Sequence, residues 1–231
     1  MANVPWPSVR AKKMRLTRLD SCGAPVEGTK STAVSSGLVS IDVSAEYEDG
    51  TENAPKNGND DFCFIDRQPD KFKYFTLGIQ FCGVDPELWE MVTGNPIYED
   101  AAGNAVGIKF GRYSEIETAF ALEVWSDVPG TNCGAGGKRW GYHLFPFIGA
   151  ARLDELTLNN ETAEFTLGNA ITKDGTGWGV GPYNVTLDDA ATPAPAKLPE
   201  ALDELDHYLP ITVQVAPPAD TDGAVALDFT P

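Results

Sequence analysis

The dominant pattern in this chain is an alternation of apolar and polar residues with a period of two. It is clearest between Val39 and Tyr47, where every second residue is apolar and the residues between them are polar. A strand with this pattern buries one face and leaves the other in water. A second run of the same kind covers residues 73–82, so we expect the two strands to pair as a hairpin. Their apolar positions and two from the segment that follows form the predicted core: Val39, Ile41, Val43, Phe75, Leu77, Ile79, Phe81, Leu88 and Met91.

The segment after the second strand carries the best helix signal. Asp85 is a favourable N-cap, Pro86 suits the first helical position, and Gly94 suits the position after the last turn. Leu88 and Met91 lie on one stripe of this helix. A helix of two or three turns is not stable alone in water, so we expect it to pack on a sheet.

The rest of the chain also predicts β-structure. Alternating or turn-bounded segments occur at residues 14–19, 105–112, 117–125, 140–147, 153–158, 162–167 and 211–215. Residues 20–37 are rich in turn formers, and residues 199–205 suggest one short acidic helix. The predicted fold class is mainly β: a sandwich or barrel with one short flanking α-helix. The organisation has a basic N-terminal arm or first strand (1–19), a β-rich domain (20–183), and a linker with a C-terminal segment that forms no separate domain (184–231).

Residues 48–72 interrupt the hairpin with a long stretch of turn formers. The only apolar patch in this stretch lies between Phe62 and Ile65. Loops of this length inside a compact domain are uncommon and are usually functional or mobile. We therefore expect the loop to become ordered only in contact with another molecule.

The charge of the chain is strongly negative and unevenly distributed. The formal net charge is −17, yet residues 1–19 carry five basic residues and no acidic one, so the remainder carries −22. This negative charge argues against binding to nucleic acid or to an anionic membrane, since binding to either requires clustered Lys and Arg. The first 16 residues lack the apolar core of a signal peptide, so we expect synthesis and assembly in a cytoplasm.

The sequence contains no recognisable motif for catalysis or metal binding. His143 and His207 have no nucleophile or metal spacing around them. The glycine-rich run before Lys138 fails as a phosphate-binding loop, because Arg139 stands where Ser or Thr must bind magnesium. The acidic loop lacks the ligand ladder of an EF-hand. We predict a protein that is not an enzyme and has no cofactor or metal. A reducing compartment favours free thiols over disulfides at Cys22, Cys63, Cys82 and Cys133.

A series of sequence blocks nevertheless resembles a known family. After a Trp-Pro pair near the N-terminus, the chain reads MRLTRLDSCGAPV, GLVSIDVSAEYEDG, FTLGIQFCGVDPELWEMVTGNPIY, ALEVWSDVPG, WGYHLFPF and ITKDGTGWGVGPYNV, in that order. This order resembles the major tail proteins of long-tailed, siphovirus-type phages, notably those of actinobacteria. The resemblance covers nearly the whole chain, but too few residues follow Pro195 for the immunoglobulin-like domain that some members append.

The resemblance implies a structural virion protein. Homohexameric rings would stack into a tail tube through which phage DNA passes without specific binding, with a tape-measure protein and a tail terminator as further partners. Assembly would take place in the host cytoplasm and the product would be part of the virion. The resemblance makes one wet sheet face the channel wall, and alternation assigns to it Ser40, Asp42, Ser44, Glu46, Thr76, Gln80, Thr162, Glu164 and Thr166. Contacts between subunits are expected at Arg10, Lys12, Lys13, Arg15, Glu48, Asp49, Glu52, Asp60 and Asp61.

Two other readings remain open at this stage. A head–tail connector or tail-terminator protein would form a single ring instead of a tube. A carbohydrate-binding β-sandwich would present exposed aromatic residues on one face, for which Trp125, Trp140 and Trp178 are the candidates.

Overall fold

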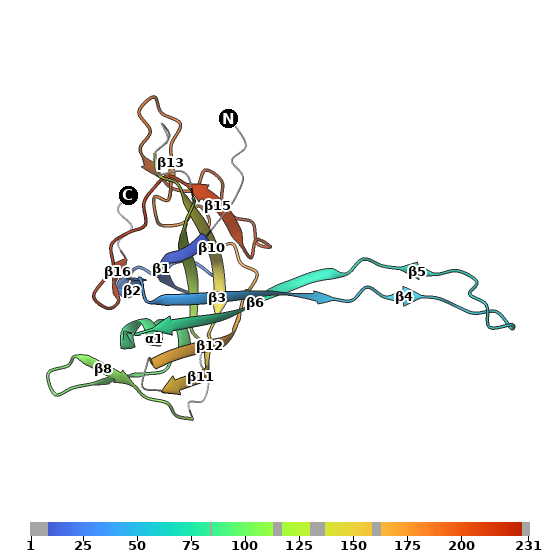
Figure 1. The fold of residues 1–231 in the computed structure, drawn as a ribbon, viewed down its shortest axis with the longest axis horizontal. Helices are drawn as coiled ribbons and strands as arrows, with labels where there is room; N and C mark the ends of the chain where they lie inside the picture. The colour runs from blue at the N-terminus through green and yellow to red at the C-terminus, as the bar shows by residue number, and fades with distance from the viewer. Residues whose placement is uncertain (1–8, 84, 113–116, 130–136, 159–162, 228–231) are drawn as a thin grey trace.

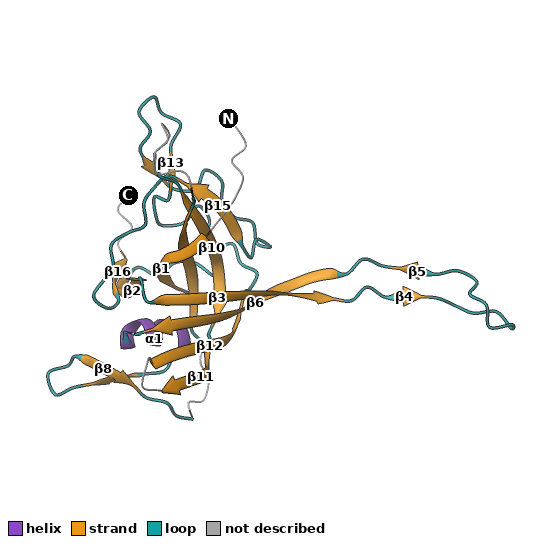
Figure 2. Cartoon of the chain, viewed as in Figure 1, coloured by secondary structure: helices purple, strands orange, loops and turns teal. Residues whose placement is uncertain are grey.

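The computed structural model describes residues 9–83, 85–112, 117–129, 137–158 and 163–227. Two antiparallel sheets face each other, and the predicted mainly β fold of the sandwich type, with one short helix, is confirmed (Figures 1 and 2). In Figure 1, β3, β6 and β12 run across the view and β10 crosses them steeply. Within the described part of the chain, no helix combines the length and apolarity needed to span a membrane.

The larger sheet has six strands and contains both the N-terminal and the C-terminal strand. Its order is β15 (Leu209–Val213), β10 (Trp140–Gly149), β9 (Ala119–Asp127), β1 (Val9–Leu19), β2 (Gly28–Ser35) and β16 (Val225–Leu227). The basic N-terminal segment is therefore not a free arm from residue 9 onward, because β1 is a central strand. β2 was not expected, since its residues lie within the turn-rich stretch 20–37 and show no clear alternation.

The smaller sheet has four strands and contains the predicted hairpin. Its order is β11 (Arg152–Leu158), β12 (Ala163–Ile171), β6 (Lys71–Cys82) and β3 (Leu38–Glu48). The register of the hairpin places Ile41 opposite Ile79 and Val43 opposite Leu77. β3 and β11 are the two edges of this sheet.

Three small ribbons leave the sandwich. They pair β4 (Glu52–Asn53) with β5 (Asp66–Arg67), β7 (Ile97–Glu99) with β8 (Ala105–Ile108), and β13 (Thr186–Leu187) with β14 (Pro195–Ala196). The first of these continues the β3–β6 hairpin and extends far beyond the body in Figure 1. Residues 199–205, expected as a short helix, form bends and turns instead.

The helix α1 (Pro86–Thr93) begins and ends where its capping residues predict. The Asp85 carboxylate accepts a hydrogen bond from the Glu87 N–H over 2.8 Å, and Gly94 ends the helix with a φ of 70°. A left-handed φ is costly for residues with a Cβ, which explains the glycine. Leu88, Met91 and also Trp89 are buried against the sandwich.

Apolar side chains form two cores, one on each face of the six-stranded sheet. The first lies between the sheets, where Leu122 of β9 packs with the apolar side chains of β6 and α1. The second lies on the outer face, where Trp125 of β9 packs with Trp178, Val185 and Leu198 of the C-terminal part of the chain. β9 is consequently buried on both faces, although its alternation alone suggested a half-buried strand. The segment 184–231, which had no predicted role, supplies part of the outer cover and both edge strands of this sheet.

Candidate functional site: a polar sheet face and a projecting arm

One face of the four-stranded sheet is polar, and strand pairing brings together the residues expected to line a channel. Ser40 is opposite Gln80 across β3 and β6, and Thr166 of β12 is opposite Gln80 on its other side. The Ser40 hydroxyl donates a hydrogen bond to the Gln80 amide oxygen over 3.2 Å. We call these residues the polar face; its members are Ser40, Asp42, Ser44, Glu46, Thr76, Gln80 and Thr166.

The electrostatics of the polar face are those of a surface that repels anions. Asp42 and Glu46 are exposed carboxylates, and the other members carry neutral hydroxyl or amide groups. The remaining two expected channel residues add nothing here, because Thr162 and the side chain of Glu164 lie outside the described residues. These seven side chains offer a polyanion such as DNA no cation to bind, and Arg152 of β11, opposite Gly168, is an exposed cation on the same side of the sheet.

Several residues predicted for the core are buried as expected, but three in β3 are not. Leu77, Ile79, Phe81, Leu88 and Met91 are at most 4% exposed, and Phe75 is half-buried. By contrast, Val39 is 45% and Val43 is 43% exposed, and Ile41 is half-buried at the rim of the core. The prediction was wrong for Val39 because the register shifts between Leu38 and Ser40, so that Leu38 enters the core in its place.

Val43 has a different reason for its exposure. It lies on the core side of the sheet, opposite buried Leu77, but the two sheets separate where the hairpin leaves the body. The result is a groove of about 230 Å³ between the sheets. We call it the inter-sheet groove; its described lining is Arg10, Ala11, Ile41, Val43, Val124, Ser126, His143, Phe145 and Tyr208.

Residues 49–70, expected as a loop, form a narrow two-stranded ribbon that we call the arm. The Gln68 N–H donates to the Thr51 carbonyl and the Cys63 N–H to the Pro55 carbonyl, while Asn57 closes the turn at the end. The strands approach so closely at Gly50 that a Cβ there would lie 1.8 Å from the Gln68 carbonyl oxygen. Local backbone pairing therefore gives the arm a defined path, although few side chains cover it.

The arm displays both acidic and apolar side chains to solvent. All five acidic residues predicted for subunit contacts are exposed: Glu48, Asp49, Glu52, Asp60 and Asp61. Near the turn, Phe62 is 56%, Phe64 is 53% and Ile65 is 62% exposed, and we call these three residues the arm-tip cluster. Isolated exposed apolar residues are ordinary, but three large ones gathered on a projecting ribbon are typical of an interaction surface.

Of the basic residues predicted for subunit contacts, Arg15 is the one the structure contradicts. It is 7% exposed, and its guanidinium makes a two-pronged ion pair with Glu123 while stacking 3.3 Å from the centre of the Tyr183 ring. Burial tends to lower the pKa of Arg15, but the Glu123 carboxylate outweighs it and raises that pKa above its ordinary value. Arg10 is exposed, Lys12 pairs with Asp127, and Lys13 with Asp220.

The two histidines have structural partners. His207 is buried, with Nδ1 2.6 Å from the Thr172 hydroxyl and Nε2 2.7 Å from Asp174, and its ring meets Phe72 at the base of the arm. The Thr172 hydroxyl is buried and accepts the Phe75 N–H, so the trio offers a substrate no accessible nucleophile. His143 contacts the Tyr208 hydroxyl through Nδ1 at 2.6 Å.

The tryptophans considered for carbohydrate binding do not form an exposed platform. Trp125 is 1% and Trp178 is 5% exposed, and both belong to the outer core. Trp140 is half-buried, with the Lys138 ammonium 3.7 Å from its ring centre. The structure thus removes the observation on which that alternative rested.

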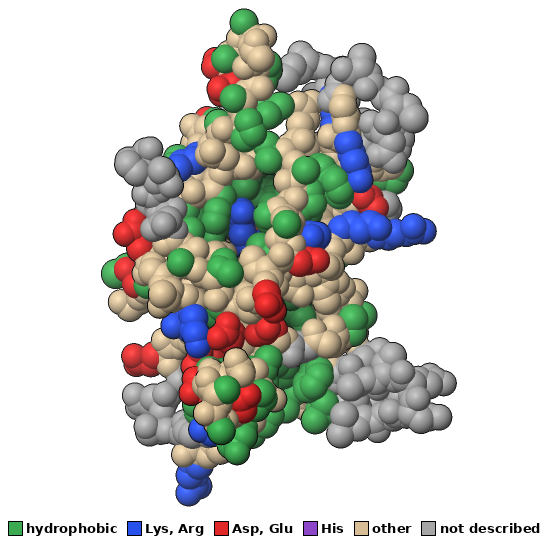
Figure 3. All heavy atoms as spheres, turned by 90° about the vertical axis from the view of Figure 1, so that its left-hand side faces the viewer, with side chains coloured by type: hydrophobic (Ala, Val, Ile, Leu, Met, Phe, Trp, Pro, Cys, Tyr) green, Lys and Arg blue, Asp and Glu red, His purple; other side chains and the backbone are tan. Residues whose placement is uncertain are grey.

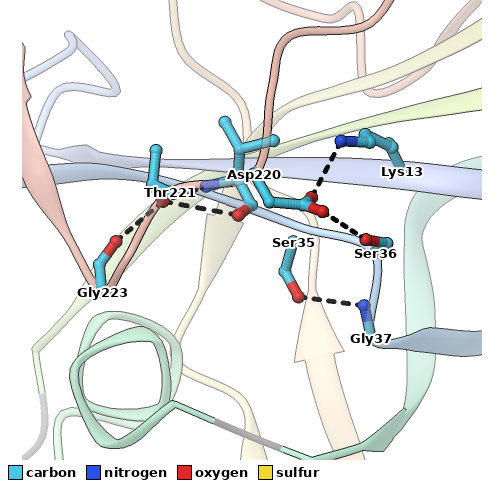
Figure 4. Close-up of polar contacts among 8 residues, drawn as sticks. Lys13, Ser35, Ser36, Gly37, Asp220, Thr221 and Gly223 are labelled. Atoms are coloured by element: carbon cyan, nitrogen blue, oxygen red, sulfur yellow. Dashed lines mark hydrogen bonds and ion pairs between the residues drawn. The ribbon is translucent and has the colours of Figure 1, made fainter.

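A second hollow, of about 240 Å³, lies between the end of β2, the start of α1 and residues 220–223 (Figure 4). In it the Asp220 carboxylate accepts hydrogen bonds from Lys13 and Ser36, and Thr221 exchanges hydrogen bonds with Val34. These polar groups form hydrogen bonds with one another, and the bonds hold the C-terminal segment against β2. Among the described residues, no group of three or more His, Cys, Asp or Glu side chains is placed to hold a metal ion.

The end of the molecule opposite to the arm has a mixed surface. Figure 3 shows acidic and basic side chains interspersed there among apolar ones. The ion pairs of Lys30 with Glu87 and of Arg18 with Glu90 tie β2 and β1 to α1.

Comparison with known proteins adds no assignment: the chain matches no protein-family model and no curated protein.

The features that sequence reasoning missed are the inter-sheet groove and the buried Arg15–Glu123 pair. Both depend on segments more than 80 residues apart in the chain, such as β3 with β9 and β1 with β9. The arm-tip cluster had a local signal, the apolar patch between Phe62 and Ile65.

Proposed function

We propose that this chain is the subunit of a hollow tube, the tail tube of a long-tailed phage, built from stacked rings of six copies. The observation that carries the proposal is the four-stranded sheet. One of its faces packs on the core and the other carries the polar face with its two carboxylates, while the edge strands β3 and β11 can each pair with another chain. The ordered resemblance of the sequence blocks to major tail proteins supplies the family and the ring of six.

The edges of this sheet support assembly by strand pairing. β3 and β11 are 11 and 7 residues long, and each presents one side on which the described chain places no further strand. Edges of this length invite pairing with another chain unless they are covered, and closure into a ring removes them. If β3 of one copy pairs with β11 of the next, the polar faces line a common channel.

The polar face suits a channel that conducts DNA. Asp42 and Glu46 repel phosphate, and the hydroxyl and amide groups beside them are short enough to leave the bore open. Along the seven residues of the polar face DNA meets no Lys or Arg that would hold its backbone, and Arg152 of β11, opposite Gly168, is an exposed cation beside them.

Electron microscopy of the concentrated protein tests the proposal. We expect long hollow tubes with six-fold symmetry and the four-stranded sheet on the inside. Isolated rings would instead support the tail-terminator alternative, and a protein that stays monomeric at every concentration would contradict both.

A further inference from the structure

We propose that the arm-tip cluster of one copy inserts into the inter-sheet groove of another copy. The inference rests on the proposed self-assembly and names the acceptor that the projecting arm requires. The donor is Phe62, Phe64 and Ile65, and the acceptor is the apolar part of the groove, formed by Ile41, Val43, Val124, Phe145 and Tyr208.

The two surfaces are chemically matched. An apolar cavity of about 150 Å³ is enough to bind benzene, so a groove of 230 Å³ has room for a phenylalanine ring. Val43 lies in the groove at 43% exposure, and its burial by a neighbour's ring would remove apolar surface on both molecules from water.

Charge favours the same pairing. The arm, residues 49–70, carries six acidic and two basic residues, a net charge of −4. None of the described groove residues is acidic, and the exposed Arg10 is among those that line the groove. Asp61 and Asp66 flank the arm-tip cluster in sequence and would lie close to Arg10.

Geometry makes the contact intermolecular. Phe62 of the cluster pairs with Lys56, which is eight residues beyond Glu48 at the end of β3. At about 3.3 Å per residue, this places the cluster roughly 25 Å outside the sheet. Figures 1 and 2 show the arm pointing away from the body that contains the groove. Donor and acceptor are different surfaces of one chain, so the contact is heterologous and propagates from copy to copy.

The arm also needs a partner for its own stability. Isolated two-stranded ribbons are marginal in water. Backbone pairing, the turn network of Asn57 and two exposed ion pairs, Lys56 with Asp60 and Arg67 with Asp70, hold this ribbon together, and exposed ion pairs contribute little to stability. Docking on a neighbour would stabilise it and bury its three exposed apolar side chains.

Disulfide trapping tests the contact with a natural thiol. Cys63 lies within the arm-tip cluster and is exposed. With the other three cysteines changed to serine, Val43→Cys should give a disulfide to Cys63 of another copy under mild oxidation, identified by mass spectrometry. Val225→Cys, on β16 and similarly exposed at 38%, is the matched control and should cross-link at least tenfold less.

Two further measurements keep the result decisive. The thiol at position 43 should react freely with a maleimide in dilute monomer, whereas protection would mean that the chain's own residues fill the groove and would overturn the proposal. Phe64→Ser should raise the concentration needed for assembly roughly tenfold or more. The control Leu205→Ser, at a residue that is 73% exposed, should leave it unchanged.

The outcomes separate this inference from the proposed function. Tubes without the cross-link between positions 43 and 63 would reject the groove as acceptor and leave the tube proposal standing. The cross-link in chains or filaments that have no hollow bore would support the contact and reject the tube.

Discussion

At the scale of single residues, burial decides which side chains stabilise the fold. Phe81 is 1% exposed in the core between the sheets, whereas Val43 on the neighbouring strand is 43% exposed. Phe81→Ala should lower the free energy of unfolding by about 3–5 kcal/mol, because it removes a buried ring and leaves a cavity. Val43→Ala should cost less than about 1 kcal/mol in the monomer. Urea unfolding of both variants checks this, and equal costs would contradict the burial described here.

The buried ion pair makes a second prediction at this scale. Glu123 accepts hydrogen bonds from both Arg15 and the Tyr142 hydroxyl. Glu123→Gln leaves the Arg15 charge buried without its counter-charge, and the expected cost is about 3–5 kcal/mol. Replacing both partners by apolar residues, Arg15→Met with Glu123→Leu, should recover much of that loss. A double variant less stable than the single one would show that the pair itself contributes net stability.

His143 predicts a pH dependence of stability. Burial lowers the pKa of His143 below its ordinary value of 6.5. The unfolded chain therefore binds a proton at that site before the folded chain does, as the pH falls below about 6.5. Since the unfolded state then holds more protons, the free energy of unfolding falls over that range. His143→Gln should lose less stability than the wild type between pH 7.5 and 5.5 in urea titrations. An unchanged slope would mean that His143 does not contribute.

At the scale of elements, the arm is separable from the sandwich. Its base is held by local contacts, such as the Gly50 N–H to the Asp70 carboxylate, which keep the pKa of Asp70 below its usual range. The last pair of the β3–β6 hairpin, Glu48 with Lys71, lies outside the arm. The arm therefore contributes little to the cores, as the proposed contact with another copy requires.

Removing the arm should leave a folded monomer that does not assemble. In this variant residues 50–69 are replaced by Asn-Gly, a sequence that favours a two-residue hairpin turn. The thermal midpoint and the circular dichroism of the sandwich should stay close to those of the wild type. Electron microscopy should show no tubes, and tubes of normal length from this variant would reject the role of the arm.

At the scale of the whole molecule, both the net charge of −17 and the location of individual carboxylates determine how strongly an assembled tube would repel DNA. Asp42→Lys with Glu46→Lys should leave folding nearly intact, because exposed charges contribute little to stability. Tubes of this variant should bind DNA with an affinity that falls steeply with salt, and DNA ejection should slow. Glu200→Lys with Glu204→Lys, at exposed bend and turn positions outside the sheets, is the control of equal charge. Equal DNA binding by both variants would place Asp42 and Glu46 outside the channel.

Features that depend on near neighbours in the chain were predictable from the amino-acid sequence. Alternation identified β3 and β6 and their pairing, because a strand with one wet face requires that period. The caps at Asp85 and Gly94 located α1, because they satisfy its end groups locally. The same alternation separated the polar face from most of the core.

How much of each sheet face is covered depends on contacts between segments that are far apart in the chain. β9 alternates like a half-buried strand, but the C-terminal segment around Trp178 covers its second face. Arg15 belongs to a basic run, yet Glu123 on the neighbouring strand holds it inside the protein. Val43 has a core position, but the sheets separate beside it and leave a groove. In each case the outcome depends on a segment far away in the chain, and a local pattern carries no information about which distant segment will pack against it.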